Sequence, residues 1–139
     1  MNIFSKEIII SNLPRVFNII TNKILNSLSE IEKIENGILF LFIKHTSASL
    51  CINENTDLTV RNDLENYFNK TVKEDLNEYE HNYEGEDDMP AHIKSTIIGS
   101  NLHIPIYKGK LSLGTWQGIY LCEHRNIPSN RKIIATILG

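Results

Sequence analysis

Residues 38–43, Ile38-Leu39-Phe40-Leu41-Phe42-Ile43, form an unbroken apolar run in this chain of 139 residues. The run begins after Asn36-Gly37 and stops at the polar residues Lys44-His45-Thr46-Ser47. Apolar runs without alternation are typical of strands that are covered on both faces. We therefore predict a central β-strand here, with protein packed on both of its sides.

The segments that flank this run predict both helices and strands. Residues 4–10 are strand-like, and apolar residues then recur every three or four positions, which indicates one amphipathic helix between about residues 12 and 31. That apolar face comprises Phe17, Ile20, Ile24, Leu28 and Ile31. After the run, a short strand at 50–52 precedes a helix that Asn55 or Thr56 can cap and that extends to about residue 69.

The second half of the chain reads mainly as hairpins. Residues 70–88 are acidic and irregular, so we expect a loop, followed by a short helix with Ile93 and Ile97 facing inward. Lys108-Gly109 indicates a tight turn between two strands, and longer strands follow at 115–123 and 132–138. The prediction is a single compact α+β domain over residues 1–139, mostly antiparallel sheet or sandwich, with about three helices.

Composition excludes several classes of function. Lys and Arg number 14 against 17 Asp and Glu, a net charge of −3, which argues against nucleic-acid binding. No apolar run approaches the roughly 20 residues of a membrane span, and no signal peptide is visible. Cys51 and Cys122 make no disulfide framework and are assigned to the core. We expect a cytoplasmic protein without nucleic-acid or membrane partners.

Three histidines lie at polar junctions where a site could form. His45 ends the apolar strand, and His81 and His92 bracket the acidic loop. Together they could make an open, three-ligand metal site of the kind that catalytic zinc occupies. The alternative is that His81 and His92 are unrelated surface residues and that His45 only binds a backbone carbonyl.

Charged residues offer further candidates. Glu123 ends the strand 115–123 on the same face as Gln117, where it could orient a ligand or take a proton, or else pair with Arg125. The acids Glu84, Glu86, Asp87 and Asp88 could hold Mg²⁺ or simply form a solvated surface. The chain has no glycine-rich phosphate loop, so an anionic substrate would need other cations. The candidates are Arg61, Lys94, Arg125 and Arg131.

The same residues carry a family resemblance that spans essentially the whole chain. The blocks HTSASL at 45–50, NEN at 53–55, HNYEGEDDMPAH at 81–92, LGTWQG at 113–118 and EHR at 123–125 resemble the YjbQ family, described as secondary thiamine-phosphate synthase enzymes, and above all its enterobacterial branch. The resemblance implies an α+β protomer in a homotrimer, with a pocket near a subunit boundary. The pocket would be lined by His45, Asn53, Glu54, Asn55, His81, His92, Gln117 and Glu123.

The resemblance also implies a low-level reaction that joins hydroxymethylpyrimidine diphosphate to thiazole phosphate. We accordingly expect a small phosphorylated substrate, a divalent metal such as Zn²⁺ or Mg²⁺ on His45, His81 and His92, and no organic cofactor. His45 would also serve catalysis, together with Asn53, Glu54, Asn55, Gln117 and Glu123. A pocket rich in histidine, carboxamide and carboxylate suits a transition metal better than a diphosphate, so the synthase reaction reads as a side activity. The alternatives are a non-catalytic trimeric protein that binds a metabolite or metal, and a metal-dependent hydrolase.

Overall fold

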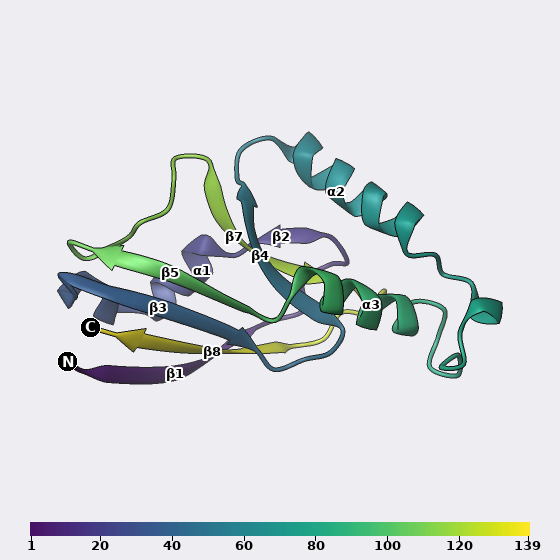
Figure 1. Ribbon diagram of the computed structural model, residues 1–139, viewed down its shortest axis with the longest axis horizontal. Coiled ribbons are helices and arrows are strands. Elements are labelled where there is room, and N and C mark those ends of the chain that lie inside the picture. Colours follow the sequence, from purple (N-terminus) through teal and green to yellow (C-terminus); the bar gives the residue numbers. More distant parts are fainter.

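The computed structural model describes residues 1–139 as two antiparallel sheets with helices packed around them (Figure 1). The larger sheet has the strand order β1-β8-β3-β5-β6, and the smaller has the order β2-β7-β4. This confirms the predicted α+β class and the antiparallel pairing. The strands are β1 (Ile3–Ile10), β2 (Phe17–Ile19), β3 (Asn36–Ile43), β4 (Ala48–Glu54), β5 (Asn101–Tyr107), β6 (Lys110–Leu111), β7 (Gln117–Glu123) and β8 (Arg131–Leu138).

The main core lies between the two sheets and contains 18 buried residues. Ile119 and Leu121 of β7 face alternate residues of the five-stranded sheet, as the parity of that strand predicts. One side of this core is closed by α1 (Thr21–Ser27) and by the 3₁₀ turn η1 (Ser29–Lys33).

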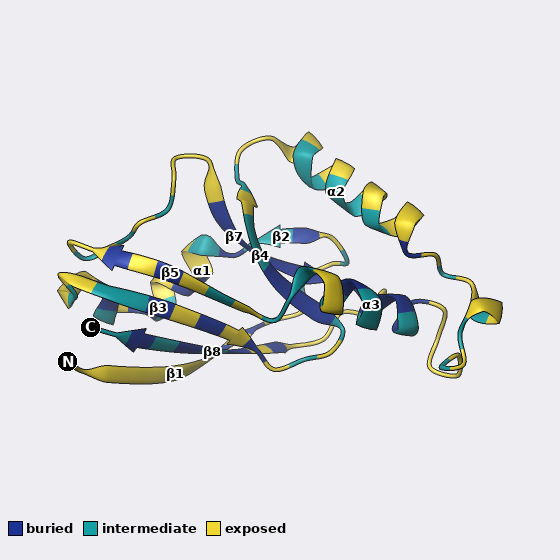
Figure 2. Ribbon diagram, in the orientation of Figure 1, coloured by how far each residue is buried: buried dark blue, intermediate teal, exposed yellow.

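The outer side of the five-stranded sheet carries no helix, which corrects one expectation. Buried and exposed residues alternate along β3 (Figure 2). Leu39 and Leu41 are fully buried, whereas Phe40 is 42% exposed and Phe42 is 50% exposed. The expectation of cover on both faces is therefore wrong within one chain, because the helices α2 (Leu58–Thr71) and α3 (Asp88–Ile98) pack on the smaller sheet instead.

The predicted helix over residues 12–31 is also replaced by shorter elements. Phe17–Ile19 forms β2, which pairs with Tyr120–Cys122 of β7, and only Thr21–Ser27 is α-helical. The five apolar residues of the predicted face are all buried, as expected. Partnership with a distant strand overrides the local helical pattern in this segment.

Two helices cover the second face of the smaller sheet. Asp57 caps α2 (Leu58–Thr71) by accepting a hydrogen bond from the Thr59 amide at 2.9 Å. The helix α3 (Asp88–Ile98) buries Ala91 and Lys94 rather than the predicted Ile93 and Ile97. Lys94 is accommodated because its Nζ donates to Asn69 Oδ1 at 2.7 Å. The loop between these helices contains a short 3₁₀ turn, η2 (Leu76–Glu78).

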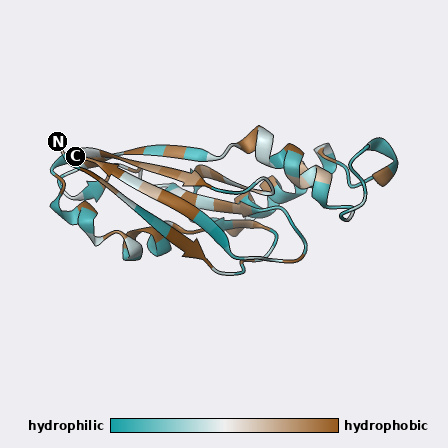
Figure 3. Ribbon diagram, turned by 90° about the horizontal axis from the view of Figure 1, so that it is seen from below, coloured by the Kyte–Doolittle hydropathy of each residue, from teal (hydrophilic) through white to brown (hydrophobic).

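The first and last strands pair along their whole length, with Ile3 opposite Leu138 and Ile10 opposite Arg131. The two chain ends consequently lie side by side (Figure 3), and β8 occupies the position between β1 and β3. The predicted hairpin at Lys108-Gly109 is confirmed, since both residues adopt the positive φ values that such a turn needs. None of the helices is both long enough and apolar enough to cross a membrane.

Candidate functional site

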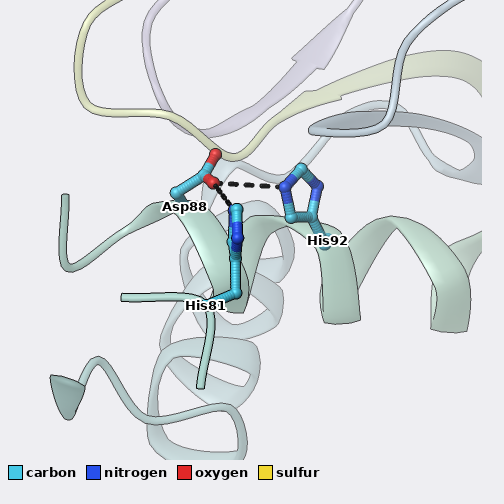
Figure 4. A group of neighbouring side chains, drawn as sticks. All are labelled: His81, Asp88 and His92. Atoms are coloured by element: carbon cyan, nitrogen blue, oxygen red, sulfur yellow. Dashed lines mark hydrogen bonds and ion pairs between the residues drawn. The ribbon is translucent and has the colours of Figure 1, made fainter. Parts of the chain in front are cut away.

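Two histidines and one aspartate converge at the start of α3 (Figure 4). Asp88 lies in the first turn of the helix, His92 lies one turn later, and His81 reaches the same point from the preceding loop. Asp88 Oδ2 is 2.7 Å from His81 Nε2 and 3.2 Å from His92 Nε2. One possible ligand atom from each residue lies within 4.8 Å of the others. We call this group the histidine–aspartate cluster.

Neighbouring groups hold the members of this cluster in orientation. The Arg125 guanidinium donates to Asp88 Oδ1, which leaves Oδ2 turned toward the imidazoles, and it also donates to Asp87 Oδ2 at 2.9 Å. His92 Nδ1 donates to the Thr46 carbonyl oxygen at 2.9 Å, which orients the ring so that Nε2 faces the cluster. A hydrogen bond from the second ring nitrogen to a carbonyl is the usual support of a metal-binding histidine.

The Asp88 carboxylate is the most buried member of the cluster. Its side chain is 3% exposed, compared with 33% for His81 and 29% for His92. Burial acts to raise the pKa of Asp88, but the hydrogen bond from His81 and the charges of His92 and Arg125 outweigh it and lower that pKa. Asp88 is therefore a carboxylate at neutral pH, as a metal ligand must be.

The donor set defines the chemistry that the cluster can support. Two imidazole nitrogens and one carboxylate oxygen suit Zn²⁺, Mn²⁺ or Fe²⁺ better than Mg²⁺, which prefers oxygen ligands. Three protein ligands on one side leave positions open for water or substrate. The residues present thus fit a catalytic rather than a closed structural metal site.

His45 belongs to the neighbouring cavity and not to the cluster itself. Its Nε2 accepts a hydrogen bond from the Lys132 amide at 2.8 Å, so this nitrogen is already engaged. Burial, followed by the charge of Arg131, lowers the pKa of His45 and keeps the ring neutral at pH 7. The cavity measures about 630 Å³ and is lined by His45, Thr46, Ala48, His92, Ser95, Thr96, Gly99 and Ser100. His92 connects the cavity with the cluster.

Glu123 is held by Arg131 and not by the Arg125 side chain. Arg131 Nε donates to Glu123 Oε1 at 2.8 Å, and Arg131 Nη2 donates to Oε2 at 2.5 Å. The Arg125 backbone amide also donates to Glu123 Oε2, at 3.1 Å. Glu123 is 1% exposed, so its carboxylate is not free to contact a substrate.

The remaining predicted residues lie at the opposite end of the smaller sheet. Ala48 pairs with Glu123 at one end of the β4–β7 ladder, whereas Glu54 pairs with Gln117 at the other end. Six residues of strand separate the two ends by roughly 20 Å. One chain therefore does not bring Asn53, Glu54, Asn55 and Gln117 to the histidine–aspartate cluster; we call these four the distal group.

Among the candidate cations, two are committed to protein carboxylates. Arg125 pairs with Asp87 and Asp88, and Arg131 pairs with Glu123. Lys94 is buried and bonded to Asn69, while Arg61 lies half-buried on α2 with its Nε unpaired. The four candidate cations therefore do not form a group of unpaired side chains that could bind a diphosphate at the histidine–aspartate cluster.

Asp88 is the member of the cluster whose place the sequence leaves open, because it stands in an acidic run that could hold Mg²⁺ or simply form a solvated surface. Its distance of four residues from His92 was the available signal, because positions i and i+4 share one face of a helix. The sequence offers Arg125 as a partner of Glu123 or as a cation for an anionic substrate, and nothing local in the sequence marks its contact with residues 84–88.

Comparisons with known proteins identify the relatives of this chain. The family model described as UPF0047 protein YjbQ-like matches residues 6–139. UPF0047 protein YjbQ of Salmonella typhimurium is 52% identical over 136 residues, and its namesake in Escherichia coli O157:H7 is 48% identical over 136 residues; each match covers 98% of both proteins.

Solved structures agree with this result. A YbjQ-like protein of unknown function from Sulfolobus solfataricus has a TM-score of 0.84 at 27% identity, with 99% of this chain and 98% of that chain covered. An uncharacterized conserved protein of the YjbQ/UPF0047 family from Clostridium acetobutylicum has a TM-score of 0.80 at 33% identity, with coverage of 96% and 99%.

Proposed function

We propose that this chain, which belongs to the YjbQ-like UPF0047 protein family, is a metal-assisted enzyme for small phosphorylated substrates. Its measurable reaction is then a slow joining of hydroxymethylpyrimidine diphosphate to thiazole phosphate, which releases diphosphate and gives thiamine phosphate. The observation that carries the metal-assisted part is the convergence of His81, Asp88 and His92 within 4.8 Å. The synthase reaction itself comes from the family resemblance.

The cavity supports a polar substrate beside the cluster. Hydroxyl groups and two imidazoles line most of it, and His92 belongs to both the cavity and the cluster. A divalent cation held there would act as a Lewis acid on a phosphate oxygen. His45 is neutral, and its Nε2 accepts a hydrogen bond from the Lys132 amide, so the ring proton is on Nδ1. His45 could donate that proton to a leaving group.

We further propose that the protein is a cytoplasmic homotrimer whose sites are shared between copies. Exposed apolar residues such as Phe40 and Phe42 on the outer side of the five-stranded sheet support assembly, because clusters of such residues often mark protein–protein contacts. The separation of roughly 20 Å along β4 between the distal group and the cluster supports a shared site. In a cyclic assembly the distal group of one copy would complete the pocket of the next.

Metal titration tests the cluster directly. Protein stripped with a chelator is titrated with Zn²⁺, and with Mg²⁺ separately, in a calorimeter. We expect one Zn²⁺ per chain, and we expect Asp88→Asn to weaken binding by more than the roughly 10–100-fold that loss of a supporting group costs. Glu84→Gln is the matched control, since Glu84 is 54% exposed and 3.6 Å from His81. Equal affinity in the two variants would reject the cluster as a metal site.

Turnover distinguishes an enzyme from a binding protein. Thiamine phosphate formation is measured with the metal-loaded protein, the stripped protein and the His45→Gln variant. We expect activity only with metal, and a loss of turnover in His45→Gln at unchanged Zn²⁺ affinity. Metal binding without turnover would instead favour a binding protein, and release of phosphate from either substrate alone would favour a hydrolase.

A further inference from the structure

Two cysteines outside the candidate site bring their sulfurs together. Cys51 of β4 and Cys122 of β7 are free thiols with 3.7 Å between their Sγ atoms. They are diagonal neighbours in the ladder, since Cys51 lies opposite Tyr120 and Ser49 lies opposite Cys122. Cys122 belongs to a small buried cluster with Phe17 and Tyr120, and Cys51 packs against this cluster, as Phe68 of α2 also does.

The two thiols have different environments. Cys122 is fully buried, whereas Cys51 is only partly buried and is the more accessible of the two thiols. A hydrogen bond from Cys122 lowers the pKa of Cys51, and burial raises the pKa of Cys122 well above its ordinary value. Because the thiolate is the reactive form of cysteine, Cys51 reacts first and Cys122 second.

We propose that Cys51 and Cys122 are an oxidant-sensitive pair that hydroperoxides convert into a reversible disulfide between β4 and β7. In the first step the Cys51 thiolate attacks a peroxide oxygen, the O–O bond breaks, and Cys51 becomes a sulfenic acid while the other oxygen leaves and is protonated. In the second step Cys122 attacks the Cys51 sulfur, and the S–O bond breaks. The hydroxyl leaves with the Cys122 proton as water. The peroxide gains two electrons, and the two thiols lose them.

The ladder geometry makes this disulfide easy to reduce. Diagonal neighbours in a sheet have Cα atoms about 7–8 Å apart, beyond the roughly 4.4–6.8 Å that is usual for disulfides. Closing the bond therefore requires the strands to shift locally, and strained disulfides are the ones that thiol reductants open readily. The pair thus suits a reversible modification rather than a permanent crosslink.

Peroxide treatment of the full-length protein tests the proposal. The reduced protein is exposed to hydrogen peroxide, remaining thiols are alkylated under denaturing conditions, and peptides are mapped by mass spectrometry without reduction. We expect loss of both thiols and a crosslink between the peptides that contain Cys51 and Cys122 within one chain, with full recovery of two thiols after dithiothreitol. Both thiols remaining alkylatable, or a crosslink only between chains, would overturn the proposal.

Single variants test the order of the two steps. In Cys122→Ser the reaction is expected to stop at a Cys51 sulfenic acid that a diketone reagent traps, whereas in Cys51→Ser the buried Cys122 is expected to stay a thiol. Thermal unfolding confirms that each variant is folded. Should the buried substitution prevent folding, Cys51→Ser still decides the order, because rapid oxidation of Cys122 in that variant contradicts it.

Discussion

At the scale of single residues, Asp88 sets the geometry of the candidate site. One of its oxygens is held by Arg125 and the other faces both imidazoles. The histidine pair could be predicted from the sequence because both residues flank an irregular acidic segment. The choice of Asp88 over Glu84, Glu86 and Asp87 could not, since it depends on a contact with Arg125, 37 residues later.

His124 leads to a prediction about pH. Its ring is buried and lies 2.8 Å from Ser49 Oγ, and burial lowers its pKa from 6.5 to about 3. Below pH 6.5, His124 therefore binds a proton in the unfolded chain but stays neutral in the folded chain. Keeping His124 neutral therefore costs no stability above pH 6.5. As the pH falls from 6.5 toward 3, the free energy of unfolding decreases by up to about 1.4 kcal/mol per pH unit.

Denaturant unfolding at a series of pH values measures this effect. We expect His124→Gln to remove the equivalent of one proton from the slope between pH 6 and 4, whatever its effect on stability at pH 7. The exposed His103 provides the control, because His103→Gln should leave the slope unchanged. Parallel slopes for wild type and His124→Gln would contradict the expectation.

At the scale of elements, local patterns identify those segments whose partners are also local. The hairpin at Lys108-Gly109 follows from turn chemistry within the segment, and it is confirmed. The strand β2 could not be predicted in this way, because residues 17–19 pair with residues 120–122, about a hundred positions later. The face that α3 buries could not be predicted for a related reason. Lys94 is buried through its hydrogen bond to Asn69, and no periodicity in the sequence indicates that bond.

The ion pair between β7 and β8 carries a prediction about stability. Glu123→Gln leaves the Arg131 guanidinium, whose side chain is 6% exposed, without its charged partner. Removing one member of a buried pair costs about 3–5 kcal/mol. We therefore expect a lower thermal midpoint, and a partial recovery when Arg131→Met is added.

The exposed pair of Glu7 and Lys44, 3.4 Å apart, is the matched control. Glu7→Gln should cost at most about 1 kcal/mol, because solvent screens exposed pairs. Equal thermal midpoints for Glu123→Gln and Glu7→Gln would show that the buried pair does not stabilise the fold. Zinc affinity measured on the same variants reports whether Glu123 also influences the site.

At the scale of the whole molecule, the side of the larger sheet that no helix covers predicts assembly. Its alternate positions, which we call the outer sheet face, carry apolar residues from all four long strands, interspersed with polar ones such as Ser5, Glu7, His103 and Thr136. The apolar members are Ile3, Ile9, Ile38, Phe40, Phe42, Pro105, Tyr107, Ile134 and Leu138. We expect the wild-type protein to have the mass of three chains in light scattering at micromolar concentration.

Substitution on the outer sheet face checks which surface is used. Burying one phenylalanine contributes about 1.5–3 kcal/mol, so the double change Phe40→Ser and Phe42→Ser should shift dissociation by at least tenfold, roughly. Tyr67→Ser is the control, since Tyr67 is 62% exposed but lies on α2. A monomeric wild type contradicts the trimer, and a trimeric double variant contradicts this face.

The position of β8 between β1 and β3 has a consequence for the order in which the strands can pair as the chain is synthesised. A ribosome releases β1 first, but the strand that pairs with β1 lies in residues 131–138. Until those residues emerge, β3 also lacks the neighbour that joins it to β1. The larger sheet therefore closes only after residues 131–138 have been made, although β3 can pair with β5 before that. Contacts this distant in sequence slow folding, and β1 in particular has no partner strand until the last strand of the sheet is available.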